Sequence, residues 1–175
     1  MSDSYKPIPG DDEYFKVLGI AVMAFQRLEW DVLYCCDRLS RGFIRNAQNN
    51  LWTSMQIAKG GKKKKGGGKS EGAKELFARV SDRDLRDRLS GLIDNHIRIV
   101  DDRNQLVHAE PATKEDPSGG NQRLIYMAGS KNKVWFIDDL KKFIGECVDL
   151  GCYFNPILYN ELKEGHNISL EDLSE

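Results

Sequence analysis

The sequence has no hydrophobic run long enough to span a bilayer, and its first ten residues contain neither a basic segment nor an apolar core of the kind found in secretory signals. We therefore expect a cytoplasmic protein that does not enter a membrane. With 175 residues and ordinary apolar content, the chain is long enough for one well-buried core and short for two. A single domain over residues 1–175 is expected.

An excess of one charge sign is also lacking, because 26 basic and 27 acidic residues leave a formal net charge of -1. Overall charge therefore gives no reason to expect binding to nucleic acid or membranes, and any affinity for RNA must come from local basic patches.

Groups that hold metals and cofactors are scarce. The cysteines, Cys35, Cys36, Cys147 and Cys152, match no common zinc spacing and are interpreted as reduced core thiols. Gly68-Lys69-Ser70 resembles the end of a Walker A loop, but Lys63 stands where the first glycine is required and no apolar strand precedes it. A nucleophile elbow and a dinucleotide fingerprint are absent as well, so we expect no metal and no cofactor.

Apolar residues recur at alternating three- and four-residue spacing, the pattern of amphipathic helices. The first helix should begin at Asp11 or Asp12 and bury Phe15, Leu18, Val22, Phe25, Val32, Cys36 and Leu39. Further helices are expected over Phe43 to Ala58, over Ala73 to Val80, and from a cap at Ser81-Asp82 to about His108.

The rest of the chain predicts a hairpin and a last helix. Pro111 and the segment 116–120 indicate a loop, and 123–128 and 133–137 have the β-branched and aromatic content of a small β-hairpin. Asp138 or Asp139 should cap a final helix that Pro156 kinks or divides. We therefore predict an all-α helical bundle with a small β-hairpin inserted before the last helix and a polar tail at 164–175.

Residues 59–72 are almost entirely glycine and lysine, a composition that cannot pack because glycine is costly to order and the lysines repel one another. We interpret them as a flexible, solvated loop. Its lysines offer a transient electrostatic contact to RNA backbone. They are Lys62, Lys63, Lys64 and Lys65.

The most informative segment is 101–108, at the end of the longest regular helix, where Arg103, Asn104 and His108 occur together. Histidine titrates near neutral pH, and arginine offers a fixed cationic fork to a phosphate. With the ribose 2′-hydroxyl as nucleophile, these groups suffice to cleave RNA without a metal. The alternative for His108 alone is a helix cap that suits the helix dipole.

Helix geometry separates the two main groups of this segment. Arg103 and His108 are five residues apart and diverge by roughly 140° on an ideal helix. Either the helix unwinds near His108 or a second copy of the chain completes the site.

Arg103 lies on an apolar stripe and needs an anionic partner there, for which Glu29, in mid-stripe of the first helix, is the natural candidate. This pair would either support the site or form a purely structural salt bridge. His96 lies on the same stripe as Arg103 and is interpreted as a hydrogen-bonded core histidine.

The segment resembles the Arg-x4-His signature of the HEPN superfamily, with the usual polar residue after the arginine present as Asn104. The order of helices and the inward glutamate are similar as well. The resemblance implies a homodimeric, metal-independent endoribonuclease of the kind found in toxin and antiphage-defence systems. His108 would be the general acid and base, Arg103 would stabilise the phosphorane, and Asn104 would orient the histidine or the phosphate.

An antitoxin or regulatory protein partner fits this resemblance, but some toxins of the superfamily are inhibited through a tyrosine two residues after the histidine, and Glu110 stands at that position here. The alternative function is a noncatalytic HEPN-like module that binds nucleotides, RNA or proteins and dimerises.

Overall fold

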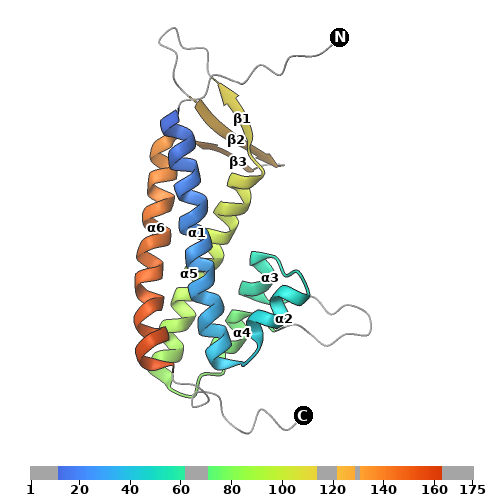
Figure 1. Cartoon of the computed structure of the whole chain (residues 1–175), viewed down its shortest axis with the longest axis vertical. Helices are drawn as coiled ribbons and strands as arrows, with labels where there is room; N and C mark the ends of the chain where they lie inside the picture. Colours follow the sequence, from blue (N-terminus) through green and yellow to red (C-terminus); the bar gives the residue numbers. More distant parts are fainter. Residues whose placement is uncertain (1–11, 62–70, 114–121, 129–130, 163–175) are drawn as a thin grey trace.

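Three long helices lie side by side and form the body of the molecule (Figure 1). They are α1 (Asp12–Leu39), α5 (Arg83–Val107) and α6 (Ile137–Pro156) in this computed structural model, which describes residues 12–61, 71–113, 122–128 and 131–162. The short helices α2 (Phe43–Asn49), α3 (Ser54–Lys59) and α4 (Ala73–Ala78) pack beside the lower half of this column. The prediction of a helical bundle is confirmed. No helix of the described residues is both long and apolar enough for a membrane crossing.

A small antiparallel sheet lies at the upper end of the column, before the last helix as predicted (Figure 1). It contains β1 (Glu110–Thr113), β2 (Gln122–Ala128) and β3 (Lys131–Trp135) in the order β1-β2-β3. The sequence predicted only the second and third strands, because Pro111 was interpreted as the start of a loop. Pro111 instead lies in β1 at the sheet edge, where its missing N–H is tolerated.

The buried line of α1 differs from the predicted one. Phe15 and Val22, both expected in the core, are 50% and 37% exposed. The buried positions include Tyr14, Val17 and Ala21, with the Tyr14 hydroxyl donating a hydrogen bond to the Trp135 carbonyl oxygen at 3.0 Å. This bond ties the start of α1 to the end of the sheet, so the aromatic residue that faces the core is Tyr14 rather than its neighbour.

The predicted second helix, Phe43 to Ala58, is wrong as a continuous element. Helix α2 ends at Asn49, and Leu51 adopts a left-handed backbone conformation with φ 50°. Helix α3 then begins at a capping box, in which the Thr53 hydroxyl accepts from the Gln56 N–H and the Gln56 side chain accepts from the Thr53 N–H. The turn between the two helices places Trp52 beside the column.

Helix α6 begins earlier than expected, at Ile137, because the Asp139 carboxylate accepts a hydrogen bond from the Phe136 N–H at 2.9 Å. Its α-helical part ends at Pro156, as the proline predicted, and a π-helical turn η1 (Ile157–Glu161) follows. The expected tail at 164–175 lies outside the described residues.

Two glycines bring the described ends of the predicted 59–72 loop together. Gly60 caps the C-terminus of α3 with φ 83°, and Gly72 caps the N-terminus of α4 against it. A Cβ atom at Gly72 would lie 2.0 Å from the Gly60 backbone nitrogen, so no side chain fits there without movement of the backbone.

We predict that Gly72→Ala lowers the free energy of unfolding by about 2 kcal/mol or more, since backbone atoms must move apart. Gly91→Ala is the matched control, because Gly91 lies inside α5 with open space around it. The control is expected to be neutral or stabilising by up to about 1 kcal/mol. Urea denaturation measures both, and equal stability of the two variants would contradict this account of the α3–α4 junction.

Candidate functional site

The C-terminal end of α5 sets the geometry of the predicted site. The helix begins at the Asp82 cap, whose carboxylate accepts from the Leu85 N–H at 2.8 Å, and ends at Val107. His108 has left helical geometry, with φ -101° and ψ 5°, while its N–H still bonds the Asn104 carbonyl oxygen at 3.2 Å. The helix therefore ends just before His108. This is one of the two arrangements that the sequence required for Arg103 and His108 to share a site.

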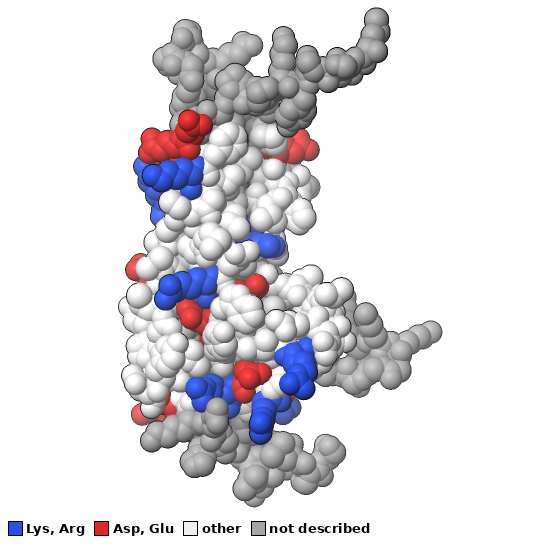
Figure 2. Space-filling view, viewed as in Figure 1, with Lys and Arg blue, Asp and Glu red and all other residues white. Residues whose placement is uncertain are grey.

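A single hollow of about 540 Å³ collects the predicted residues. Its lining residues come from α1, from the start of α3 and from the end of α5: Glu29, Trp52, Thr53, Ser54, Arg103, Asn104 and His108. Arg103, Asn104, His108 and Glu29 thus share one hollow within a single chain. In the space-filling view the outline of the molecule is indented between the small-helix lobe and the upper part of the column (Figure 2).

Sequence reasoning missed the wall formed by Trp52, Thr53 and Ser54. The signal that identifies it is Thr53-x-x-Gln56, since threonine or serine followed three residues later by glutamine marks a helix start. The capping box fixes the start of α3 and therefore the position of the two hydroxyl groups at the hollow.

Arg103 is held by an aromatic ring and an amide. Its guanidinium carbon lies 5.4 Å from the centre of the Phe25 ring, and its Nη1 donates to the Asn104 Oδ1 at 3.3 Å. Asn104 therefore positions the arginine in addition to lining the hollow. Among the described residues no carboxylate lies within 4.0 Å of Arg103, so its positive charge is available to an anion in the hollow.

The predicted ion pair between Glu29 and Arg103 is not formed. Glu29 lines the same hollow, but its Oε1 is shielded from solvent and has no hydrogen-bond partner among the described residues. Glu29 and Arg103 lie on the apolar stripes of two neighbouring helices and therefore line one hollow. They do not contact each other, because the guanidinium lies over the Phe25 ring. A buried acceptor without a donor is costly and marks a place where a ligand donor is favoured.

His108 is exposed at the rim of the hollow, and no acidic neighbour on α5 orients it. Asp102 is engaged elsewhere, with Lys133 at 2.6 Å and Arg98 at 3.6 Å. The imidazole is thus free to contact a molecule that enters the hollow.

His96 lies in the core, as predicted, but it is not hydrogen-bonded. Neither of its ring nitrogens has a partner among the described residues, and its ring stacks on Phe25 at 6.2 Å between centroids. Burial lowers the pKa of His96 to about 4. The Phe25 ring therefore contacts both the neutral His96 ring and the Arg103 guanidinium.

The cysteines carry no chemistry at this site. Cys35, Cys36 and Cys147 are buried free thiols, and burial raises the pKa of both Cys35 and Cys147 to about 12. Cys152 is exposed, which corrects the prediction of a core thiol. Within the described residues, no three histidine, cysteine or acidic side chains lie close enough together to hold a metal ion.

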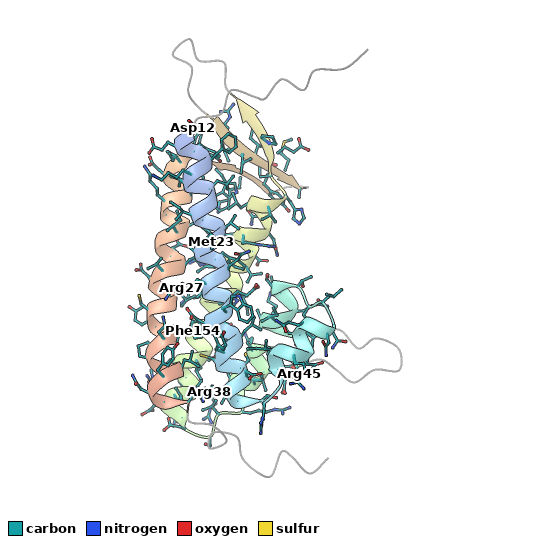
Figure 3. The ribbon with its side chains drawn as sticks, viewed as in Figure 1. Asp12, Met23, Arg27, Arg38, Arg45 and Phe154 are labelled. Carbon is teal, nitrogen blue, oxygen red and sulfur yellow. The ribbon has the colours of Figure 1, made fainter. Side chains whose placement is uncertain are left out.

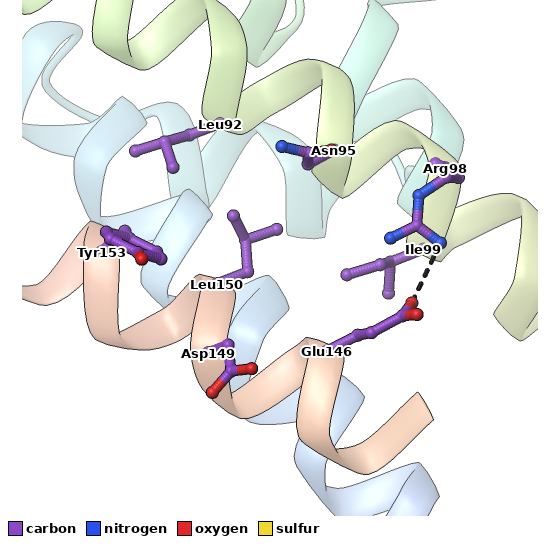
Figure 4. Close-up of a pocket in the computed structure, with 8 residues that line it drawn as sticks. All are labelled: Leu92, Asn95, Arg98, Ile99, Glu146, Asp149, Leu150 and Tyr153. Atoms are coloured by element: carbon purple, nitrogen blue, oxygen red, sulfur yellow. Dashed lines mark hydrogen bonds and ion pairs between the residues drawn. The ribbon is translucent and has the colours of Figure 1, made fainter. Parts of the chain in front are cut away.

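A second hollow, of about 300 Å³, lies between α5 and α6 (Figure 4). Its one cationic lining residue is already paired, since Arg98 Nη1 lies 2.9 Å from Glu146 Oε2 across the two helices. Tyr153 closes one end of it (Figure 4). It has no histidine and no unpaired cation, so the hollow at the end of α5 is the better candidate for chemistry on an anionic substrate.

No protein-family model, curated protein or solved structure matches this chain. The assignment of a function therefore rests on the residues around the hollow.

Proposed function

We propose that this chain is a metal-independent endoribonuclease of the HEPN type, acting in the cytoplasm on RNA. The observation that carries the proposal is the convergence of Arg103, Asn104 and His108 on one hollow, although Arg103 and His108 are five residues apart in the chain. The unpaired Arg103 cation, the His108 imidazole and the hydroxyl groups of Thr53 and Ser54 surround a space large enough for a phosphodiester and its sugars.

In the proposed reaction the ribose 2′-oxygen forms a bond to phosphorus while the bond from phosphorus to the 5′-oxygen breaks. A base removes the 2′-hydroxyl proton and an acid gives a proton to the departing 5′-oxygen. His108 performs these transfers, and the Arg103 fork compensates the charge that develops on the non-bridging oxygens. The products are a 2′,3′-cyclic phosphate and a 5′-hydroxyl.

A homodimer supplies a second His108, so that one imidazole acts as base while the other acts as acid. Self-association is favoured by the exposed apolar side chains on one face of α1, which include Met23, Trp30 and Tyr34, 65%, 41% and 49% exposed. Met23 lies near the middle of α1 (Figure 3). Toxin or defence activity and an antitoxin partner are further parts of the proposal.

Local basic patches offer contacts for RNA backbone despite the small net charge. Arg38 lies at the end of α1 and Arg45 on α2, both in the lower part of the molecule (Figure 3), and both are exposed. Arg41, which lies between them in the sequence, is exposed as well. Blue side chains gather there in Figure 2. Lys62 to Lys65 lie outside the described residues, so their contact with RNA stays a prediction.

The test is cleavage of single-stranded and stem-loop RNAs by the purified chain in excess chelator. We expect cleavage in unpaired segments, where the backbone can reach in-line geometry. RNA that is bound but left intact across the whole panel would overturn the proposal in favour of a noncatalytic binding module.

A further inference from the structure

A third, more apolar hollow adjoins the candidate site. It has a volume of about 360 Å³, lies between α1 and the α2–α3 turn, and shares Glu29 and Trp52 with the first hollow. Ile44 and Leu51 supply aliphatic surface in it, and Gln48 adds an amide. A polar, cationic space and a more apolar one therefore lie next to each other, with Glu29 and the Trp52 indole at their common border.

The wall of this third hollow contains a strained residue, Leu51. Leu51 combines a left-handed backbone, φ 50°, with a side chain that is 87% exposed. A leucine rarely adopts this conformation, and here burial of its side chain does not compensate the cost. Trp52 is fixed next to it by an edge-on contact with Phe43 at 5.5 Å between ring centroids. The turn therefore presents a fixed indole and an exposed aliphatic side chain to whatever occupies the hollow.

Glu29 lies where the two hollows meet, and its buried Oε1 has no donor. The natural occupant of the apolar hollow has a flat π-face for the indole and N–H groups for this carboxylate. Among the RNA bases, guanine alone offers two neighbouring donors, N1–H and the 2-amino group, to the two oxygens of a carboxylate. Adenine, cytosine and uracil each direct at least one acceptor toward it on the same edge.

We propose that the hollow between α1 and the α2–α3 turn is a nucleobase subsite, and that Glu29 selects guanine in it. This inference rests on the proposed ribonuclease function and names its sequence preference. Trp52 stacks on the base while Arg103 and His108 contact the adjoining phosphate.

Calorimetric titration of the intact protein with 3′-GMP, 3′-IMP, 3′-AMP and 3′-UMP tests the proposal without any need for cleavage. We expect 3′-GMP to bind at least tenfold more tightly than 3′-AMP, with 3′-IMP, which lacks the 2-amino group, between them. Glu29→Gln should reduce the ratio of the two affinities to about one, mainly by weakening the binding of 3′-GMP. Glu13→Gln, on an exposed position of the same helix, should keep the wild-type ratio.

Three results would overturn the subsite: equal affinity for all four nucleotides, a guanine preference that survives Glu29→Gln, or an equal loss of affinity for every nucleotide in a Glu29→Gln variant that is folded. Failure of the ribonuclease proposal gives a different result, in which the guanine preference is present and depends on Glu29 while no RNA is cleaved. Replacement of Trp52 by leucine, with folding verified by circular dichroism, should weaken all four nucleotides together.

Discussion

Replacing His108 with alanine is expected to slow RNA cleavage by about 10²- to 10⁴-fold, since His108 is the one imidazole among the described residues that line the hollow. The folded structure should be unaffected, because the His108 side chain is exposed and its role in ending α5 is carried by the backbone. Single-turnover rates on one oligonucleotide, with circular dichroism of both proteins, measure the effect.

Arg103→Lys separates charge from geometry at the same site. Lysine keeps the positive charge but loses the planar fork, so we expect a loss of about tenfold or more, and a larger one for Arg103→Ala. Arg83→Ala is the matched control, because Arg83 is an exposed arginine at the opposite end of α5. A control that loses as much activity as Arg103→Lys would show that general charge, and not the hollow, governs cleavage.

Acid should destabilise the protein through His96. Burial lowers the pKa of this histidine to about 4 in the folded chain, against about 6.5 when unfolded. Between these two pH values the unfolded chain binds a proton that the folded chain does not. The free energy of unfolding therefore keeps its full value above about pH 6.5 and falls as the pH drops toward 4. The total loss is about 3 kcal/mol, and about 2 kcal/mol of it has appeared by pH 5.

The replacement His96→Leu removes this titration and keeps an apolar side chain of similar size against Phe25. Urea denaturation measures the free energy of unfolding of both proteins at about pH 7.5 and about pH 5. The variant should be about 2 kcal/mol more stable relative to the wild type at pH 5 than it is at pH 7.5. The His108→Ala variant, which removes an exposed histidine, should follow the wild type. An unchanged difference between His96→Leu and wild type at the two pH values would mean that His96 is not buried as a neutral ring.

Helix periodicity predicted the three long helices because α1, α5 and α6 each have a regular apolar stripe, although the start of α1 buries Tyr14 where Phe15 was expected. The Asp82 cap and the end of α5 before His108 have local signals in the sequence. The break between α2 and α3 was missed because it depends on Leu51 at φ 50°, a conformation that leucine's own preferences oppose. Leu51 is also 87% exposed, so its side chain gives no signal for the turn, and local propensity extends the predicted helix through it.

The candidate site shows a similar division. Arg103, Asn104 and His108 were predictable as a group because they are close in the chain and meet at a helix end. The partner of Arg103 was not predictable, since a stripe gives the face on which a residue lies but not the group that its side chain contacts. An aromatic ring on the same face, Phe25, holds the guanidinium instead. Trp52 joined the site through the turn before α3, whose capping-box signal at Thr53 and Gln56 the prediction of one continuous helix overlooked.

The chemistry of the cleaved ends tests the central claim most directly. An RNA cleaved in excess chelator is analysed for its termini, and the same RNA is then made with a single 2′-deoxy nucleotide at the mapped position. The account predicts 2′,3′-cyclic phosphate and 5′-hydroxyl ends, and no cleavage of the 2′-deoxy substrate. Ends that carry a 3′-hydroxyl and a 5′-phosphate, or cleavage of the 2′-deoxy substrate, would contradict it, because the nucleophile would then be water and not the ribose.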